Sequence, residues 1–290
     1  MKIVNIIGGL GNQMFQYAFA YALQMRNPEE QVLIDTSMFR GYHLHNGFEL
    51  DRLFGLRLPV AGKEDLCRVT RYIPYYPLSR LVRKIMPPLK TVYLDPEYLS
   101  FDPAAMTQSG DVYYDGYWQT EKYFWDIRDT VLDLFTFKDV LRPYSAELAE
   151  RISGTDSVAI HVRRGDYTQA SNYRGICDLD YYDRAISKAK ELVQDPCFFV
   201  FSDDPSWCKR NLSPMLGAAE TVFVEGNTGV NSSDDMRLMS VARCNILANS
   251  SFSWWAAYLN RRGDKLAIVP PKWVNEVESR DVYLDSWIKV

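Results

Sequence analysis

Residues Lys2–Leu23, KIVNIIGGLGNQMFQYAFAYAL, decide how the chain begins to fold. The apolar run from Ile3 to Ile7 is typical of a buried strand, and the residues from Gln13 to Met25, after three glycines, predict a helix. Another short apolar run, QVLIDTS, predicts a second strand that ends in an aspartate. This β-α-β order predicts an α/β fold with a parallel sheet.

The second half of the chain shows the same alternation. Five short apolar segments predict strands: SVAIHV, CFFVFS, TVFVE, NILAN and LAIVP. The segments between them predict helices: DLDYYDRAISKAKELV, DPSWCKRNL, SSDDMRLMSVARC and SFSWWAAYLNRRG. Strands that alternate with helices predict a doubly wound parallel sheet, whose ligands bind at the carboxyl ends of the strands. We therefore expect the ligand-binding and catalytic residues at those ends.

The length and one polar segment predict two domains. A chain of 290 residues with 47% apolar residues can bury a large core, and a chain of this length favours two domains over one. A predicted helix near Ser145 to Ile152 is followed by the polar run SGTDS, which is typical of a passage between domains. We expect one domain over residues 1–153 and another over 154–290, with its last helix a candidate to pack back on the first domain.

Composition excludes several classes of protein. A net charge of -4 argues against a nucleic-acid partner. Five cysteines, without C-x-x-C spacing, favour a reducing compartment and argue against a structural zinc. No apolar run approaches the ~20 residues of a membrane span, and the first strand leaves no room for a signal peptide. We expect a cytoplasmic protein that needs no metal, and the sequence leaves its oligomeric state undefined.

The segment RVTRYIPYYPLSRLVRKIMPPLK, residues 68–90, carries six basic residues and no acid. We favour an ordinary solvated helix between prolines. The alternative is a patch that meets an anionic membrane surface or a glycan acceptor. Peripheral contact with the inner membrane is therefore a second option for this protein.

The segment AIHVRRGDY has the strongest functional signal. Side chains alternate along a strand, so His161 and Arg163 share one face while Arg164 points the other way. Arg163, at the carboxyl end of the strand, can place its planar guanidinium on a phosphate or a carboxylate. Arg164 is expected to bind Asp166 or a neighbouring carboxylate and hold the loop. The alternative is that both arginines form ordinary ion pairs.

The segment FFVFSDDPSW places two aspartates after the next strand. Pro205 suits the first position of a helix, which makes Asp204 its N-cap. Asp203 is then left for a ligand, and its carboxylate can accept two hydrogen bonds from the edge of guanine. The alternative, that both aspartates only cap the helix, has about the same weight.

In NILANSSFSWWAAYL a strand ends and a helix begins within a serine-rich turn. A helix N-terminus favours an anion, so a pyrophosphate could lie over Ser250 to Ser253. Phe252 contacts a base or seals the core, and the two tryptophans are expected in the core or at a domain interface rather than as sugar platforms. His43 and His45 have no carboxylate or cysteine at ligand spacing, so no metal site is predicted.

Five motifs follow one another along the chain: GGLGNQMFQYAFAYAL, GYWQTEKYF, HVRRGDY, FSDDPSW and NSSFSWWAAYL. Together they resemble the bacterial α-1,2-fucosyltransferases of glycosyltransferase family 11, over nearly the whole chain. The resemblance implies a GT-B fold, with two Rossmann-like domains facing across a cleft, the first mainly for the acceptor and the second for GDP-β-L-fucose. It implies metal-independent transfer of fucose to the 2-hydroxyl of a terminal β-galactose, with lactose, N-acetyllactosamine or a lipid-linked glycan as acceptor.

The resemblance also implies roles for individual residues. Arg163 would neutralise the β-phosphate of the departing GDP, with His161 nearby, and Asp203 would bind guanine. The pyrophosphate region and its surroundings would be held by Ser251, Phe252 and Ser253, and by the first-domain loop residues Gly9, Gly11 and Asn12. The candidates for acceptor binding are His45, Tyr117, Trp118 and Gln119. Inversion calls for a general base, and the candidates are Asp115, Asp166, Glu121 and His45.

Two other classes of function remain as alternatives, beside transfer of fucose to another position. An NAD(P)-dependent oxidoreductase rests on the opening glycine loop alone, and Met14 stands where the dinucleotide fingerprint needs its third glycine. A non-catalytic glycan- or nucleotide-binding protein would bind the sugar and never turn it over.

Overall fold

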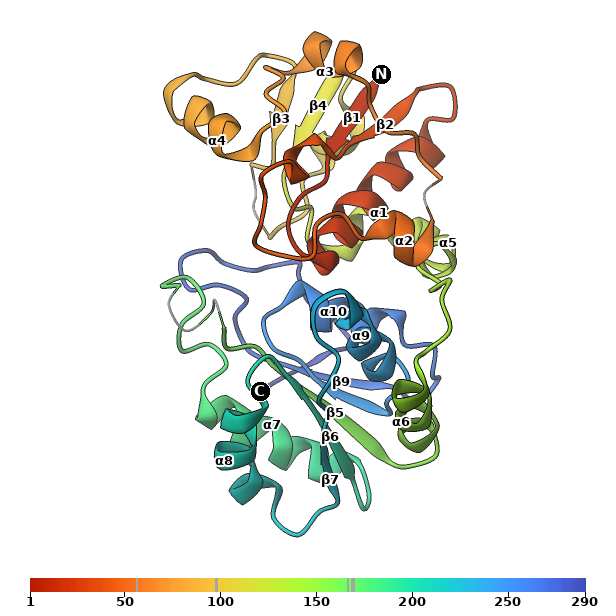
Figure 1. Ribbon diagram of the computed structural model, residues 1–290, viewed down its shortest axis with the longest axis vertical. Coiled ribbons are helices and arrows are strands. Elements are labelled where there is room, and N and C mark those ends of the chain that lie inside the picture. Colours follow the sequence, from red (N-terminus) through yellow and green to blue (C-terminus); the bar gives the residue numbers. More distant parts are fainter. Residues whose placement is uncertain (56, 97–98, 166, 168–169) are drawn as a thin grey trace. The chain divides into compact units, whose positions relative to one another are not determined.

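The computed structural model describes residues 1–55, 57–96, 99–165, 167 and 170–290 (Figure 1). They form two compact units, Met1–Asp139 with Arg280–Val282, and Val140–Ser279 with Tyr283–Val290. The chain therefore passes from one unit to the next after Asp139 rather than after the expected residue 153.

The helix before the expected boundary explains this difference. Helix α6 (Pro143–Ser153) belongs to the second unit, because the Ser145 hydroxyl donates to the Asp234 carboxylate of α9 (Ser233–Met239) at 3.0 Å. Arg142 forms an ion pair with the same carboxylate at 2.9 Å. The last described helix stays in the second unit, and the segment that joins the first unit is Arg280–Val282.

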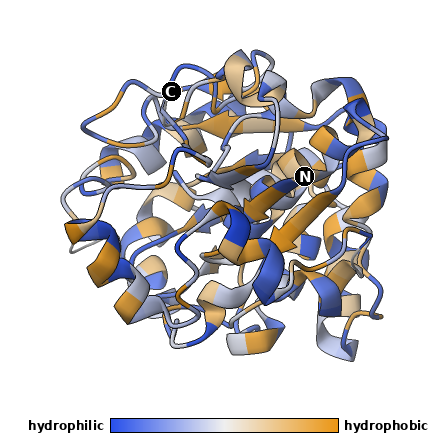
Figure 2. Cartoon of the chain, turned by 90° about the horizontal axis from the view of Figure 1, so that it is seen from above, coloured by the Kyte–Doolittle hydropathy of each residue, from blue (hydrophilic) through white to orange (hydrophobic). Residues whose placement is uncertain are grey.

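The first unit contains a four-stranded parallel sheet. Its strands are β1 (Lys2–Asn5), β2 (Val32–Asp35), β3 (Val92–Leu94) and β4 (Val112–Asp115), in the order β2-β1-β4-β3. In Figure 2 the strand at the N-terminus carries both colours, because hydrophobic Ile3 and Val4 lie between hydrophilic Lys2 and Asn5. After β2 the chain crosses to the other side of β1, so the carboxyl ends of β1 and β4 flank a topological switch point, where ligands of such sheets bind.

Helices and short 3-10 turns connect these strands. The helices are α1 (Leu10–Arg26), α2 (Leu50–Phe54), α3 (Lys63–Val69), α4 (Tyr76–Ile85) and α5 (Arg128–Leu134). The 3-10 turns are Ser37–Phe39, Pro103–Thr107, Glu121–Tyr123 and Trp125–Ile127. Helix α1 begins earlier than predicted, so Gly11 and Asn12 lie in its first turn rather than in a loop.

The second unit contains a six-stranded parallel sheet. Its strands are β5 (Ser157–Val162), β6 (Cys197–Ser202), β7 (Thr221–Phe223), β8 (Cys244–Ile246), β9 (Leu266–Val269) and β10 (Ile288–Lys289). Their order is β10-β9-β8-β5-β6-β7, which confirms the predicted doubly wound sheet and adds a strand that was not predicted. The order reverses between β5 and β8, which form the switch point of this sheet.

Burial fixes which face of β5 meets which helices. Val158, Ile160 and Val162 pack in one core with α7 (Leu179–Leu192) and α8 (Pro205–Leu216). Because side chains alternate along a strand, His161 faces the opposite side, toward α10 (Ser251–Leu259). The predicted core position of the tryptophans is confirmed, since Trp254 and Trp255 are fully buried.

Two properties of the described part of the chain bear on membrane insertion and metal binding. No helix there is both long and apolar enough to cross a membrane. The same residues contain no cluster of three or more histidine, cysteine, aspartate or glutamate side chains that could hold a metal ion. All five cysteines are free thiols.

Candidate functional site

The switch point of the second sheet brings together two of the predicted segments. The His161 ring, on β5, lies 5.6 Å from the Phe252 ring at the start of α10. The Tyr167 hydroxyl, after β5, donates to the Asn249 carbonyl, before α10, at 3.1 Å. The loop after β5 and the turn after β8 are therefore held to each other at the carboxyl edge of the sheet.

Arg163 lies beside this junction. Its guanidinium forms an ion pair with the Asp203 carboxylate, with Nη1 and Oδ2 3.2 Å apart, and lies 5.8 Å from the centre of the Tyr167 ring. About 30% of the Arg163 side chain is exposed. A permanent cation with a planar set of donors is thus held at the switch point, within reach of an anion in solvent.

Asp203 also fixes the loop that carries Arg163. Its two carboxylate oxygens accept the backbone N–H groups of Arg164 at 2.9 Å and of Gly165 at 3.1 Å. A Cβ at Gly165 would lie 2.9 Å from Oδ2, so this close approach requires glycine. Asp203 is therefore not left to a ligand alone, as the sequence suggested, and its contact with guanine stays a prediction.

Arg164 and Asp204, the next charged pair, have the contacts that the sequence predicts. The Asp204 carboxylate caps α8, accepting the Trp207 backbone N–H at 3.0 Å. Arg164 binds the same carboxylate through Nε at 3.3 Å, and its guanidinium lies 4.0 Å from the centre of the Trp207 ring. The prediction that Arg164 holds a neighbouring carboxylate is confirmed. Asp166, the other predicted partner and a candidate base, lies outside the described residues.

His161 is a buried, neutral imidazole. Burial, and then the positive charge of Arg163, lower its pKa from 6.5 to about 3. Its backbone carbonyl accepts the Tyr182 hydroxyl at 3.0 Å, which fixes the end of β5. The Nδ1 atom is buried without a hydrogen-bond partner among the described residues. A neutral ring of this kind can make a polar contact with a ligand but carries no charge to offer it.

Three serines lie at the N-terminus of α10: Ser250, Ser251 and Ser253. Ser250 caps the helix, its hydroxyl accepting the Phe252 backbone N–H at 3.3 Å, and Ser251 at the first position is half-buried. The first turn contains no acid, so its N–H groups favour an anion. The Ser253 side chain is buried and donates to the carbonyls of Ala248 and Ser250, so the donor contact predicted at this residue would use its backbone N–H and stays a prediction.

The glycine loop lies at the carboxyl end of β1 in the first unit. Gly8 has a positive φ of 94°, which favours glycine, and Gly9 precedes the first residue of α1. The ring of His45 lies over this loop, 3.4 Å from the Cβ that a residue other than glycine would have at position 9. The donor role predicted for Gly9, Gly11 and Asn12 stays a prediction, since these residues belong to the first unit.

Two buried glutamines of α1, which the sequence analysis missed, organise the loops around this end of the sheet. Gln13 donates to the carbonyls of Gly8 at 2.9 Å and Gly47 at 2.8 Å, and accepts the backbone N–H of Glu49. Gln16 accepts the backbone N–H of Ile7 at 2.9 Å and donates to the carbonyl after β4 at 3.0 Å. The available signal was two amides three residues apart in an otherwise apolar helix.

Asp115 ends β4 at the switch point of the first sheet. Its carboxylate accepts the Asn5 side-chain amide at 2.8 Å and forms an ion pair with Arg83 of α4 at 2.5 Å. A pocket of about 320 Å³ opens beside it. This pocket is lined by Asn5, Ile7, Gln16, Met38, Tyr76, Ser79, Arg80, Arg83, Asp115, Gly116 and Tyr117.

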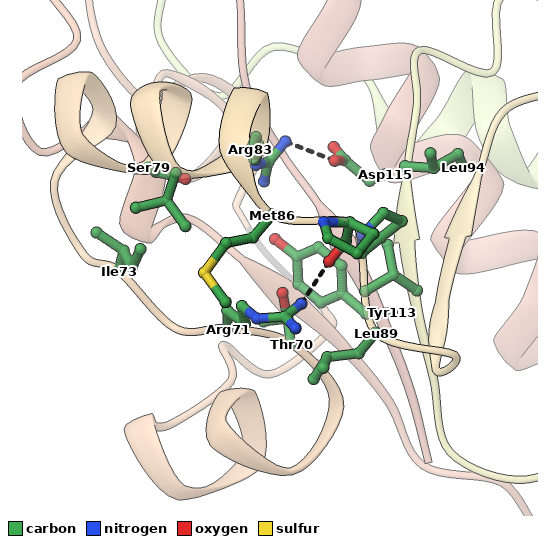
Figure 3. A pocket seen from close by; sticks show the side chains of 14 residues that line it. Thr70, Arg71, Ile73, Ser79, Arg83, Met86, Leu89, Leu94, Tyr113 and Asp115 are labelled. Carbon is green, nitrogen blue, oxygen red and sulfur yellow. Dashed lines mark hydrogen bonds and ion pairs between the residues drawn. The ribbon is translucent and has the colours of Figure 1, made fainter.

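A second, more apolar pocket adjoins the first. Its volume is about 270 Å³, and it shares Ser79, Arg83 and Asp115 with its neighbour. Figure 3 shows Arg83 of α4 directed at Asp115, and Arg71 directed at the chain near Pro87, whose carbonyl accepts a hydrogen bond from it. Asp115 therefore lies where a polar and an apolar pocket of the same unit meet.

The four predicted acceptor residues have different surroundings. Tyr117 lines the polar pocket and is partly exposed. The prediction for Trp118 is wrong, because this side chain is fully buried and stacks on Phe19 with the ring centres 4.3 Å apart. Gln119 is buried, and its amide donates to Asn12 at 2.7 Å. His45 is exposed over the glycine loop.

Comparison with known proteins adds three findings. The model of glycosyl transferase family 11 matches residues 89–290. An α-1,2-colitosyltransferase of Escherichia coli is 34% identical over 99% of this chain and 98% of its own length, and a galactoside α-(1,2)-fucosyltransferase 2 of Mus musculus is 26% identical over 88% and 67%. The crystal structure of NodZ α-1,6-fucosyltransferase, soaked with GDP-fucose, has a TM-score of 0.53 at 18% identity and covers 89% of this chain and 91% of that one.

The two parallel α/β units have the GT-B-like fold of this fucosyltransferase structure. The family match covers more than half of the chain, and the Escherichia coli relative is similar over nearly its full length. The chain belongs to glycosyltransferase family 11, and it is an enzyme that transfers a sugar.

Proposed function

We propose that this enzyme transfers L-fucose from GDP-β-L-fucose to the 2-hydroxyl of a terminal β-galactose, inverting the linkage to α and using no metal. The observation that carries the proposal is Arg163, held by Asp203 at the switch point beside the N-terminus of α10. The murine relative, a galactoside α-(1,2)-fucosyltransferase, supports the choice of sugar and linkage.

Charge on the departing nucleotide is the feature of the reaction that this site would stabilise. The bond between fucose C1 and the β-phosphate oxygen breaks, and its electron pair leaves with GDP. The galactose O2 bonds to C1 from the opposite face and gives its proton to a base. Arg163 and the N–H groups at the start of α10 are fixed before the reaction, so they can stabilise the growing negative charge without reorganising.

Asp203 would act as a positioning residue in this scheme. In the ligand-free protein its carboxylate already contacts the Arg163 guanidinium, at 3.2 Å. The hydrogen bonds from the Arg164 and Gly165 N–H groups support a role in aiming the guanidinium.

We assign the acceptor to the polar pocket of the first unit. Sugar hydroxyls need polar partners, and this pocket offers Asn5, Arg80, Asp115 and Tyr117 at the carboxyl end of the sheet. Asp115 is the carboxylate there that can accept a proton or orient a hydroxyl. A lactose, N-acetyllactosamine or lipid-linked galactoside would fit this description.

A second candidate is transfer of colitose, because the Escherichia coli relative is an α-1,2-colitosyltransferase. Colitose is fucose without its 3-hydroxyl, so the same site could take both sugars unless it hydrogen-bonds that hydroxyl. A site built to bond a hydroxyl rejects the analogue without it by a factor of about 10⁴. The ratio of kcat/KM for the two donors therefore decides between the candidates.

A donor screen tests the proposal. Purified enzyme with EDTA and lactose is given GDP-fucose, GDP-colitose, GDP-mannose or UDP-galactose, and released nucleotide is measured. We expect release from GDP-fucose. Release only after magnesium is added would contradict metal independence, and binding without release from any donor would favour a non-catalytic protein. NADH binding is the matched control for the dinucleotide alternative.

A further inference from the structure

Helix α4 presents an apolar row to solvent. Leu78, Leu81 and Ile85 are spaced three and four residues apart, which places them on one face of the helix. Leu81 is 54% exposed and Ile85 is 73% exposed. The opposite face is inward, since Ser79 is buried and Val82 lines the apolar pocket. Single exposed leucines are ordinary, but a row of them on one short helix marks an interaction surface.

Basic side chains surround this row. Arg80, Lys84 and Lys90 are exposed, and Arg71 and Arg83 lie near them along the chain. No acidic residue occurs from position 66 to position 94, although the whole chain has a net charge of -4. Exposed Tyr75 and Met86 extend the apolar surface at the two ends of α4. In Figure 2 the helix at the left edge, where α4 lies in Figure 1, alternates between hydrophobic and strongly hydrophilic residues.

We propose that α4 docks this enzyme on a membrane that contains anionic lipids. Apolar side chains of such a helix enter the boundary between headgroups and acyl chains, while arginine and lysine reach the lipid phosphates and tyrosine suits the interface. Charge complementarity selects the occupant, because a segment with six basic residues and no acid of its own is attracted to anionic headgroups. A nucleic acid would match the charge but leave Leu81 and Ile85 exposed.

Docking through this face has a consequence for the acceptor. Helix α4 also supplies Ser79 and Arg83 to the pockets beside Asp115. Docking would therefore bring those pockets close to the lipid headgroups, which suits a glycan carried on a lipid. This consequence rests on the proposed function, whereas binding to lipid does not.

Vesicle sedimentation tests the docking. The full chain is mixed with vesicles of phosphatidylcholine, or of phosphatidylcholine with 30% phosphatidylglycerol, at low and high salt. We expect binding to the anionic vesicles, weaker at high salt. The double variant Leu81→Glu with Ile85→Glu should bind at least about tenfold more weakly. Val140→Glu with Val230→Glu, two exposed valines elsewhere, is the matched control and should bind like the wild type.

A second pair of variants isolates the charge. Lys84→Glu with Lys90→Glu should lower binding by about tenfold or more. Lys188→Glu with Lys272→Glu changes the net charge by the same amount on other surfaces and should have much less effect. Nucleotide release with soluble lactose, if the enzyme has that activity, and circular dichroism in any case, show that each variant is folded.

Three results would overturn the proposal. The first is a wild type that stays in the supernatant with anionic vesicles at low salt. The second is a Leu81→Glu, Ile85→Glu variant that sediments like the wild type. The third is a wild-type dimer that this variant converts to a monomer without any change in lipid binding, because α4 would then be an interface between copies of the chain.

Discussion

Arg163 and Asp203 form an ion pair of 3.2 Å at the carboxyl ends of two neighbouring strands, β5 and β6. The register of these strands pairs Val162 with Ser202, so the two charged residues follow directly at the edge of the sheet. The pair joins a cation suited to a phosphate with a carboxylate that also fixes the cation's loop. Substitutions of the arginine and of the aspartate are therefore expected to have different effects.

Substitution Arg163→Ala should lower kcat by about 10²–10³ and leave the fold intact. The guanidinium would act on charge that grows in the transition state, and loss of one such group has this order of effect. Arg163→Lys should recover part of the loss, because it keeps the charge and loses the planar pair of donors. Steady-state kinetics with GDP-fucose measure the effect.

Arg151→Ala is the control for this substitution, since Arg151 is an exposed arginine that forms an ion pair with Glu220. It should leave kcat within about twofold, because exposed pairs contribute little. A kcat of Arg163→Ala equal to that of the control would exclude Arg163 from the reaction.

Substitution Asp203→Asn should weaken the binding of GDP and of inosine diphosphate by the same factor. The lost interactions aim Arg163 and fix its loop, and they do not depend on the base. Calorimetric titration with the two nucleotides gives both affinities, and Asp204→Asn, at the helix cap, serves as the control. A loss confined to GDP would instead support a direct contact with the guanine amino group, which inosine lacks.

His161 should stay neutral between pH 8 and pH 5 in the ligand-free enzyme, since burial and Arg163 lower its pKa to about 3. As pH falls below about 6.5, the unfolded chain binds a proton at this histidine before the folded chain does. The part of the free energy of unfolding that depends on neutral His161 is therefore fully present above that pH. It is lost as pH falls toward 3, by at most about 2 kcal/mol at pH 5.

NMR of the imidazole protons measures this directly, with His161→Gln to assign the resonance. The variant should also lose less stability than the wild type between pH 7 and pH 5 in urea unfolding. A His161 resonance that titrates with a midpoint near 6.5 would show that the ring is solvated rather than buried.

Asp235 should make the second unit less stable as pH rises. Burial, and next the charge of Asp234, raise its pKa from 3.8 to about 7, although the Asn227 amide donates to it at 2.7 Å. Between those two values the folded chain holds a proton that the unfolded chain has lost, so stability falls as pH rises from about 4 to 7. Asp235→Asn should therefore stabilise by up to about 4 kcal/mol more at pH 8 than at pH 4.

Urea unfolding at the two pH values measures this difference. Asp264→Asn is a control at an exposed carboxylate whose pKa is lowered by Arg262, so it should not stabilise the protein at pH 8. An equal effect of Asp235→Asn at pH 4 and pH 8 would contradict the raised pKa.

The sequence was sufficient for the fold of the second unit because each strand and helix there has its own periodic signal. Strand β10 was missed, since it has two residues and depends on pairing with β9. The boundary between the two units was predicted too far along the chain, because the sequence of α6 does not show which unit this helix packs against. Its membership in the second unit depends on contacts between Ser145 and Asp234, which are 89 residues apart.

The candidate site was predictable where topology determines position. Parallel strands end at one edge, so Arg163 and Asp203 could be expected near each other. The side-chain direction of Trp118 was not predictable, because this residue follows a tight turn where strand periodicity does not apply. The inward direction of Ser253 depends on how α10 packs on the sheet. Trp118 has a positive φ of 54°, which turns it into the core against Phe19. The role of Gln13 and Gln16 likewise depends on loops that are distant in sequence.

Linkage analysis of the product tests the central claim most directly. Purified enzyme is incubated with GDP-fucose, lactose and EDTA, and the trisaccharide is analysed by two-dimensional NMR. We expect one product, with fucose joined in α configuration to the 2-hydroxyl of galactose. A β linkage, a different hydroxyl, or hydrolysis of GDP-fucose without any trisaccharide would contradict it.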